Sequence, residues 1–474
     1  MKKITLLFLC LFIFSNLILA DDEAPTVKEW TVMVYMCADN DLEAFALQDL
    51  NELEMVGSTD NLNIIALVDR WDGYHWVFGD NGPERVRADR GDTTAEGNWT
   101  GAKIFYITKD DDMNRINSPE IADMGEIDTG NPRNIQAFTG VIGENFPAKN
   151  YMIIICNHGN GIQGVGYDDT ASIDGKLTDG KYVYMDGSKL TGPELGQVFS
   201  NVVSRIAQEE KDYIDVVGFD ACLMSMYSNH VQLGKNNVRA VIGSQELEPG
   251  NGWPYHTIMY VLKRYTDENR TLSEATFADW VVRLYMDSYE GDDVTLSGIN
   301  TTERGFDAVT EKIDALCELL VADDDNMLKL HTAAKETQRY HSGSNAGGSF
   351  AYYVDLIDLM KKIESEFDGD IADAAADVRS AIVANHIILA NRSEGNRVAD
   401  SNGIAIYFPL YRRKRTEEGA YLVRPYISAE YNGYKTDRQI FRSFDFGANS
   451  KYDELLLKYY DVLERKTDDE VGLY

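Results

Sequence analysis

The sequence predicts an α/β protein in which a mostly parallel sheet is flanked by helices and joined to a helix-rich C-terminal subdomain. Three observations predict this fold. Short apolar runs alternate with helical spacing through the first half of the 474 residues, helical patterns dominate the second half, and the hydrophobic fraction of 44% suffices for large cores. We therefore expect a sheet domain over residues 21–265 and a helix-rich subdomain over residues 266–474.

The expected strands of the first half are nearly continuous apolar runs, as in strands that are covered on both faces. They lie at 30–38, 63–68, 103–107, 151–156, 213–219 and 238–242. Between them, helical spacing predicts helices at 42–56, 134–146, 190–208 and 223–233, the first of them preceded by the possible caps Asp39, Asn40 and Asp41. This alternation is typical of a parallel sheet.

The second half carries helical patterns at 273–289, 305–321, 326–338, 352–367 and 371–389. One late apolar run, GIAIYFP at 403–409, has the character of a buried strand, and we expect it to return to the main sheet. Residues 159–189 form the one long irregular segment, rich in glycine and aspartate. A loop of that length is usually functional or disordered.

The N-terminus has the pattern of a secretory signal peptide. Lys2 and Lys3 precede an apolar run over 4–20, which ends in a small residue before three acidic ones. A membrane anchor is the alternative, but a run of this length is marginal for a span. We expect residues 1–20 to be removed and the mature chain to be secreted or periplasmic, without membrane attachment.

Charge and cysteine content narrow the function classes. The net charge of −33 repels nucleic acid and anionic membranes and attracts cationic ligands, although solubility alone would also explain it. The cysteines that remain after the signal peptide are too few for a disulfide framework in so long a chain. Cys37, Cys156 and Cys317 lie in apolar runs, as buried small residues do, whereas Cys222 lies where an apolar run ends.

Two chemically active residues follow predicted strands. His158 comes just after strand 151–156 and precedes Gly159, and Cys222 comes just after strand 213–219 and before the predicted helix 223–233. The carboxyl ends of strands are where open α/β sheets bind ligands. A helix N-terminus beside Cys222 would favour its thiolate. Taken singly, a surface histidine and a buried structural cysteine are common alternatives.

The two residues are more informative together. Their side chains would face one crevice if the two strands are neighbours, because one helical crossover fits the interval between them. A thiolate beside an imidazole is a working acyl-transfer pair, and the backbone N–H groups of Gly159 and Cys222 are candidates for holding the oxyanion. The motifs of zinc peptidases, serine hydrolases and phosphate-binding loops are absent. The residues favour a hydrolase with Cys222 as nucleophile and His158 as proton donor and acceptor.

The pairing of strand-His-Gly with strand-Asp-Ala-Cys resembles the caspase–gingipain–legumain clan of cysteine peptidases. Within it, four runs are similar to the clostripain family: WTVMVYMCADNDLE (30–43), DVVGFDACLMSM (215–226), SQELEPGNGWPY (244–255) and GIAIYFP (403–409). The resemblance implies a caspase-like fold, a His158–Cys222 dyad and a secreted cysteine endopeptidase. It departs at Ile162, where family members commonly carry an aromatic residue.

The resemblance also implies cleavage after arginine or lysine, with Asp220 forming the primary pocket. A carboxylate at the base of a pocket pairs well with a guanidinium or ammonium group, while a helix N-cap is the alternative role for Asp220. We expect Glu246, Glu248 and Trp253 to line the same crevice. Relatives are often matured by cleavage between the histidine and the cysteine, so the expected self-cleavage sites of a zymogen are Lys176 and Lys181.

The chemistry requires no cofactor, and we expect none, although the resemblance also points to calcium. Acidic runs at 110–112 and 323–325, and the DNDLE run at 39–43, offer carboxylates without a defined ligand pattern, and solvated acidic loops explain them more simply. The expected partners are peptides and proteins with basic residues. The alternative function is a catalytically silent, peptidase-like extracellular protein that binds basic peptides.

Overall fold

The computed structural model describes residues 25–79, 82–87, 97–171, 177–178, 181–182, 188–206, 211–268, 270, 272–340, 352–416, 419–423 and 437–471. The expected signal peptide and Lys176 lie outside these residues, as does the side chain of Lys181.

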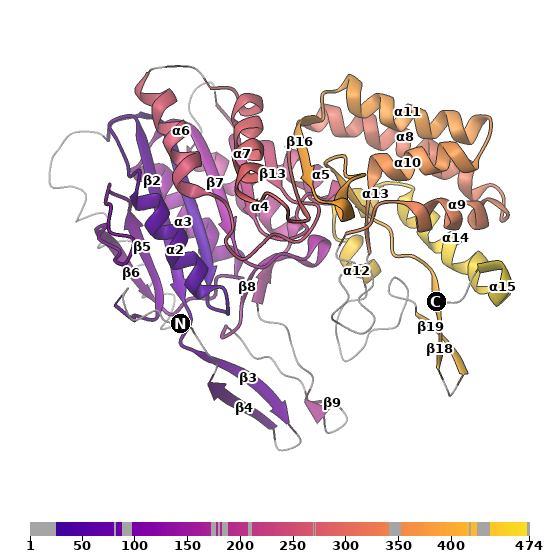
Figure 1. The fold of residues 1–474 in the computed structure, drawn as a ribbon, viewed down its shortest axis with the longest axis horizontal. Coiled ribbons are helices and arrows are strands. Elements are labelled where there is room, and N and C mark those ends of the chain that lie inside the picture. Colours follow the sequence, from indigo (N-terminus) through magenta and orange to yellow (C-terminus); the bar gives the residue numbers. More distant parts are fainter. Residues whose placement is uncertain are drawn as a thin grey trace.

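A nine-stranded sheet forms the centre of the larger of two units (Figure 1). Its five central strands are parallel and follow the order β13 (Val238–Gly243), β12 (Ile214–Asp220), β7 (Ala148–Cys156), β1 (Lys28–Ala38) and β2 (Leu62–Arg70). Antiparallel strands extend both edges: β14 (Val294–Asn300) and β16 (Ile388–Glu394) beyond β13, and β5 (Gly101–Tyr106) and β6 (Glu120–Gly125) beyond β2. The predicted fold class is confirmed.

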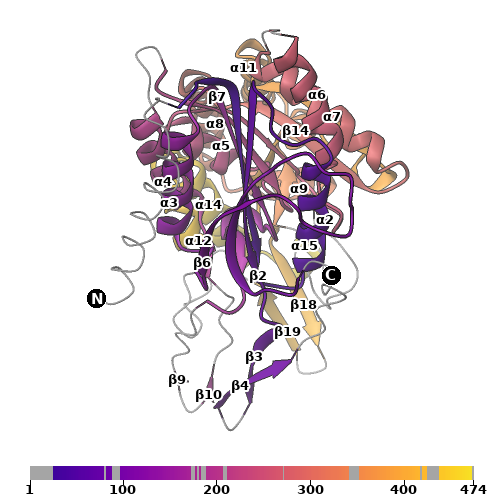
Figure 2. The same cartoon turned by 90° about the vertical axis from the view of Figure 1, so that its left-hand side faces the viewer.

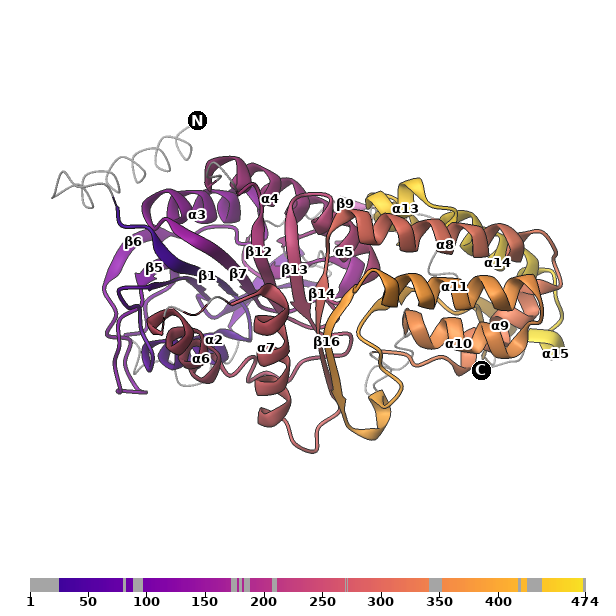
Figure 3. The ribbon, with the colours of Figure 1, turned by 90° about the horizontal axis from the view of Figure 1, so that it is seen from above.

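Helices cover both faces of the sheet (Figure 2). One face carries α3 (Pro132–Asn145) and α4 (Gly192–Ile206), and the other carries α2 (Glu43–Glu54), α6 (Tyr255–Asp267) and α7 (Glu274–Ser288) (Figure 3). Because successive side chains of a strand point to opposite faces, Met33 and Tyr35 of β1 enter the first core, while Val32 and Val34 enter the second. Burial on both faces explains why the central strands are continuous apolar runs.

A helical unit lies beside the β16 edge of the sheet (Figure 1). It contains α8 (Glu303–Val321), α9 (Asn326–Glu336), α10 (Leu356–Glu366), α11 (Asp370–Ala384), α12 (Asp437–Phe441), α13 (Asp445–Asn449), α14 (Tyr452–Glu464) and α15 (Asp468–Val471). Its core also takes in Leu223, Met226 and Tyr227, which lie just before and at the start of α5 (Tyr227–Gly234). The Tyr227 hydroxyl bonds the Thr310 hydroxyl at 2.8 Å. The helical unit is therefore packed directly against the segment that follows Cys222.

Two predictions about the second half are wrong. The run at 403–409 does not join the main sheet, because its strand β17 (Ala405–Tyr407) pairs with β15 (Tyr353–Asp355) inside the helical unit. Its apolar character comes from burial among helices. The strands that do return to the sheet are β14 and β16. Their polar residues interrupt the apolar pattern, so the sequence did not predict them as strands. The second wrong prediction is the domain boundary at residue 265, which falls within α6. Because α7 also packs on the sheet core, the helical unit begins at α8.

Short elements complete the described chain. Hairpins form between β3 (Tyr74–Gly79) and β4 (Gly82–Arg87), β9 (Leu177–Thr178) and β10 (Lys181–Tyr182), and β18 (Arg412–Thr416) and β19 (Gly419–Val423), while β8 (Val165–Asp168) pairs with β11 (Ser188–Leu190). Single 3-10 turns occur at Gly161–Gln163 and Asn396–Val398. Among the helices of the described residues, none combines the length and the apolar character that a bilayer crossing requires.

Candidate active site

The register of two neighbouring strands brings His158 and Cys222 to the same edge of the sheet. Cys156 of β7 pairs with Asp220 of β12, so the residues two positions further along leave adjacent parallel strands together. Both His158 and Cys222 line one cavity of about 310 Å³, which the end of β1 and one face of α2 also line. The spatial requirement for a dyad, that the two side chains face one crevice, is thus met.

His158 is about half exposed and is held from the side by Asp41. Its Nε2 lies 2.7 Å from Asp41 Oδ1, and this hydrogen bond lowers the pKa of the Asp41 carboxyl. Asp41 stands in the turn between β1 and α2, within the DNDLE run. It was not predicted as a site residue, although its place after the carboxyl end of a central strand is the signal that would have indicated it.

Gly159 allows the histidine loop to approach the cysteine loop. A Cβ at Gly159 would stand 2.3 Å from the carbonyl oxygen of Cys222, so any larger residue would push the two loops apart. The N–H groups of Gly159 and Cys222 donate to no other group in the part of the chain that the structure describes. Both N–H groups are thus not used by other groups among the described residues, and their role as oxyanion donors stays a prediction.

Burial of Cys222 favours the protonated form of its thiol. Burial raises the pKa of Cys222 to about 12, against the opposing effect of the Glu248 N–H group, which donates to Sγ at 3.2 Å. The predicted helix at 223–233 begins only at Tyr227, after a turn in which Leu223 has a φ of 64°. The expectation that a helix N-terminus lowers this pKa is therefore wrong, because the helix starts too far along the chain.

The segment after Cys222 is anchored rather than helical. The Ser225 hydroxyl contacts the Gly403 carbonyl oxygen at 2.7 Å and the Ser297 hydroxyl at 2.9 Å, and the Ser225 carbonyl accepts the Ala405 N–H group. These partners belong to β14 and to the segment around β17. Strands of the second half of the chain thus hold Cys222 in place.

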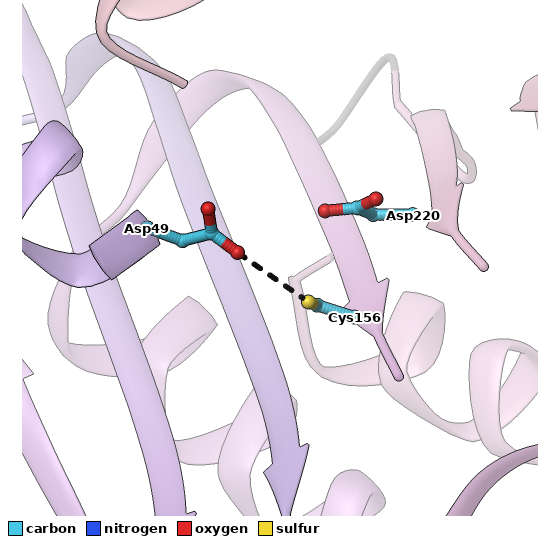
Figure 4. Close-up of side chains that lie close together, drawn as sticks. All are labelled: Asp49, Cys156 and Asp220. Atoms are coloured by element: carbon cyan, nitrogen blue, oxygen red, sulfur yellow. Dashed lines mark hydrogen bonds between the residues drawn. The ribbon is translucent and has the colours of Figure 1, made fainter. Parts of the chain in front are cut away.

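Buried carboxylates form the base of the cavity. Asp220 ends β12 and accepts hydrogen bonds from the Tyr255 hydroxyl at 2.8 Å and the Trp253 N–H at 3.3 Å. Asp49 enters from α2, and its Oδ2 lies 4.0 Å from Cys156 Sγ, with Asp220 on the other side of the thiol (Figure 4). The N-cap alternative for Asp220 is excluded, since the residue that precedes α5 is Met226.

Glu248 adds a third carboxyl that is buried from solvent. Neither of its side-chain oxygens has a well-formed hydrogen bond, and the group faces the carboxyl of Asp220 and the Trp253 side chain. Burial and mutual repulsion raise the pKa values of Glu248 and Asp49, and burial raises that of Asp220. Among the described residues, no lysine, arginine or histidine forms an ion pair with any of the three. We call Asp49, Asp220 and Glu248 the pocket acids.

The other predicted lining residues lie behind the cavity wall. Glu246 accepts the Leu247 N–H through its own carboxylate and does not line the cavity. Trp253 is fully buried, and its ring packs so closely on β12 that a Cβ at Gly218 would stand 2.9 Å from it. Neither residue lines the cavity, so their expected role as lining residues is wrong; Leu247, Glu248, Pro249, Gly250 and Gly252, which lie between them in the sequence, line it instead. Asp49 was missed; it continues the stripe Leu42, Phe45, Ala46 at helical spacing.

The sheet, with a thiol and an imidazole at its carboxyl edge, places the protein in the class of cysteine peptidases. A sequence model of the clostripain family matches residues 34–455, so the chain belongs to the clostripain family. Family and fold together make it a cysteine endopeptidase.

Individual relatives agree with this assignment. Clostripain of Hathewaya histolytica is 25% identical over 443 residues, which are 89% of this chain and 67% of the relative. A secreted C11 cysteine protease of Bacteroides thetaiotaomicron, solved with an irreversible peptide inhibitor, has a TM-score of 0.57 at 17% identity and covers 90% of this chain and 99% of its own. An inactive zymogen C11 protease of Parabacteroides distasonis has a TM-score of 0.52 at 15% identity, covering 82% and 94%.

Proposed function

We propose that the protein is an exported endopeptidase that hydrolyses peptide bonds after arginine or lysine, with Cys222 as nucleophile and His158 as proton donor and acceptor. One observation carries the proposal. The cavity that both residues line contains three buried carboxyls without a basic partner among the described residues, and a basic substrate side chain would supply the missing positive charge.

The resting geometry defines the order of proton transfers. Because the pKa of the Cys222 thiol is raised by burial, His158 must accept its proton as the thiolate attacks the substrate carbonyl carbon. The N–H groups of Gly159 and Cys222 bind the oxyanion that forms. His158 then donates its proton to the leaving amine as the C–N bond breaks. Water, deprotonated by His158, hydrolyses the thioester and frees Cys222.

Asp41 is the orienting group of this scheme. Its carboxylate fixes the His158 ring and stabilises the imidazolium that exists between the two transfers, while remaining ionised itself. No cofactor takes part in these steps, and we propose that none is needed for the chemistry.

Asp220 is the central carboxylate of the proposed primary pocket. It is fixed by the Tyr255 hydroxyl and by the backbone of Trp253, and Gly252 leaves the space in front of it open, since a Cβ there would stand 2.7 Å from Oδ2. A guanidinium or ammonium group entering the cavity would meet Asp220 first and Asp49 at greater depth. The positive charge of the substrate side chain would offset the repulsion between the buried carboxylates, so that they could be ionised together.

Export and self-processing belong to the same proposal. The pattern of residues 1–20 is that of a signal peptide, and one structural neighbour is described as a secreted protease. Another neighbour is described as an inactive zymogen. Lys176 and Lys181, between β8 and β11, are the proposed self-cleavage sites. The intact mass of the wild type beside Cys222→Ala tests this step, and two full-length masses would refute it.

The function is tested with fluorogenic peptides that differ only at the residue before the scissile bond. Wild type should cleave the arginine and lysine peptides and leave acidic ones intact, and Cys222→Ala should lose all cleavage. An irreversible thiol-directed peptide inhibitor with a basic first residue should add its mass to Cys222. A folded wild type that neither cleaves nor reacts would instead be the silent peptide-binding protein.

A further inference from the structure

A thiol lies among the carboxylates at the base of the cavity. The sulfur of Cys156 and one carboxylate oxygen each of Asp49 and Asp220 lie within 4.8 Å of one another (Figure 4). Cys156 was expected to be a buried small residue, yet it is only partly buried and lines the cavity together with the two aspartates. Neither the proposed proton transfers nor the proposed recognition of a basic side chain uses this thiol. We call Asp49, Cys156 and Asp220 the pocket-floor cluster.

Regular secondary structure holds the pocket-floor cluster together. Cys156 and Asp220 end the neighbouring strands β7 and β12 and pair with each other, so their side chains point to the same face of the sheet. Ile154 and Val216, which precede them on that face, belong to the core that α2 covers. Asp49 comes from α2 itself, and its Oδ2 lies 4.0 Å from the sulfur. The position of the cluster therefore does not depend on a loop.

The carboxyl groups around the thiol lack hydrogen-bond partners. Glu248 also lines the cavity, and both of its carboxylate oxygens are buried without a partner in the described chain. Asp49 is 2% exposed, and among the described residues its side chain bonds only the Cys156 thiol, at the long distance of 4.0 Å. The two hydrogen bonds that fix Asp220 both end on Oδ2, which leaves Oδ1 for another ligand. Because buried polar groups are normally satisfied, these oxygens indicate a cation.

We propose that the pocket-floor cluster binds one zinc ion, which competes with the basic side chain of a substrate. The metal site follows from the cluster itself, whereas the competition rests on the proposed function. A thiolate is a preferred ligand of zinc, while calcium and magnesium take oxygen ligands. One sulfur between two carboxylates therefore distinguishes this site from an ordinary group of acidic side chains.

The spacing of the cluster suits a tetrahedral zinc ion. Zinc lies about 2.3 Å from a thiolate sulfur and about 2.1 Å from a carboxylate oxygen, so two such ligand atoms are about 3.6 Å apart. The distance of 4.0 Å between Asp49 Oδ2 and Cys156 Sγ would need to shorten only slightly. The Glu248 carboxylate, which lines the same cavity without a partner, is the candidate for the fourth ligand.

Binding would exchange a proton of the thiol for the ion. The Zn–S bond forms as the S–H bond of Cys156 breaks, and the proton leaves to the solvent; no electron is transferred. The ion would then occupy the space in which a guanidinium or ammonium group meets Asp220 and Asp49. Zinc and a basic side chain would exclude each other, so zinc would inhibit the peptidase without using Cys222 or His158 as a ligand.

The test uses full-length Cys222→Ala protein that has been stripped of metal. This variant cannot digest itself, and it lacks the thiol of the dyad. Titration with cadmium chloride, a spectroscopic substitute for zinc, should produce the ultraviolet charge-transfer band of a cadmium–thiolate bond. The band should saturate at one ion per chain, and zinc chloride should abolish it. Absence of the band would overturn the proposal, and zinc binding confined to the wild type would then place the ion on Cys222.

The variant Cys156→Ser, made in the same background, identifies the sulfur. It should lose the band and bind zinc at least about ten-fold more weakly, because the thiolate ligand is gone. Cys317→Ala removes a buried thiol of the helical unit and is the matched control, which should behave like the parent. A band that survives Cys156→Ser would assign the metal to another cysteine and refute the proposal.

A second variant decides the matter if Cys156→Ser does not fold. Asp49→Asn should keep the band, since the sulfur remains, but should weaken cadmium binding by about ten-fold or more. Glu52→Gln, on the same helix but paired with His256, is its control and should bind cadmium like the parent. Equal cadmium affinity in Asp49→Asn and the parent would contradict the proposed ligand set.

Arginine amide tests the link between the metal site and the substrate. In Cys222→Ala it should weaken cadmium binding in proportion to its concentration. In the wild type, zinc should raise KM for arginine peptides and leave kcat unchanged. A band that forms at Cys156 but does not respond to arginine amide would uphold the metal site and refute the competition. Failure of the proposed specificity and failure of the metal site therefore give different results.

Discussion

The pocket acids are one group of buried carboxylates at the carboxyl edge of the sheet, and Asp39, Asp69 and Glu126, which lie close together at the ends of β1, β2 and β6, are another. In both, burial raises the pKa values of aspartates that have no basic partner in the described chain. They differ in access. The pocket acids line an open cavity, whereas Asp39 and Asp69 are closed off from solvent. Carboxylates that face a cavity are open to a visiting substrate cation, whereas burial of Asp39 and Asp69 favours their protonated, uncharged form.

The largest expected effect comes from a substitution among the pocket acids, which line the open cavity. Asp220→Asn should lower kcat/KM for arginine and lysine substrates by roughly a thousand-fold, because a desolvated substrate cation loses its central partner. Cleavage of a norleucine peptide of the same size should change by no more than a few-fold. An equal loss on the norleucine peptide would show that Asp220 supports the fold of the site and does not select the substrate cation.

A smaller effect is expected at Asp41, which contacts His158 and belongs to neither group of buried carboxylates. Asp41→Asn should lower kcat by about ten-fold with little change in KM, since the side chain orients His158 and is largely exposed. Asp41→Glu should restore part of the loss.

Much of the sheet follows from the sequence because the central strands are buried on both faces. The runs at 30–38 and 151–156 admit few other interpretations, and placing His158 and Cys222 after such strands was enough to predict that they meet. The edge strands were not predictable in the same way. Ser297 of β14, and Asn391 and Ser393 of β16, interrupt the apolar pattern, while the similar run at 403–409 is buried by helices instead.

The chemistry of Cys222 depends on features that the sequence pattern does not show. Leucine rarely adopts a positive φ, so the apolar residues after Cys222 predicted a helix where Leu223 in fact makes a turn. Only some of the pocket acids could be predicted from the sequence. Asp220 was predicted from the resemblance, but Asp49 looked like one polar residue on an amphipathic helix. Asp39 follows β1 and Asp69 lies in β2, and only the register of these two strands brings their carboxylates together.

A smaller effect is expected from Asp49, whose substitution should change the preference for arginine over lysine. In the proposed binding mode Asp49 is met after Asp220, so it should serve the longer arginine side chain more than lysine. Asp49→Asn should reduce the arginine-to-lysine ratio of kcat/KM by about five-fold, which corresponds to about 1 kcal/mol, the net value of a typical hydrogen bond. Glu52→Gln, on the same helix but paired with His256, is the control and should leave the ratio unchanged. An unchanged ratio in Asp49→Asn would place the substrate cation wholly at Asp220 and Glu248.

The smallest effect is a pH dependence confined to basic substrates. Burial raises the pKa values of Asp220, Asp49 and Glu248, so in the empty cavity these groups take up protons at a higher pH than ordinary carboxyls do. Protonation removes the charge that attracts arginine, while a norleucine substrate does not need it. The ratio of kcat/KM for arginine over norleucine peptides should therefore fall about three-fold between pH 8 and pH 5. The dyad acts on both substrates, so its own titration cancels in this ratio. In Asp220→Asn the ratio should be low and nearly flat, and a wild-type ratio that rises toward acid pH would contradict the assignment of these carboxylates to the substrate cation.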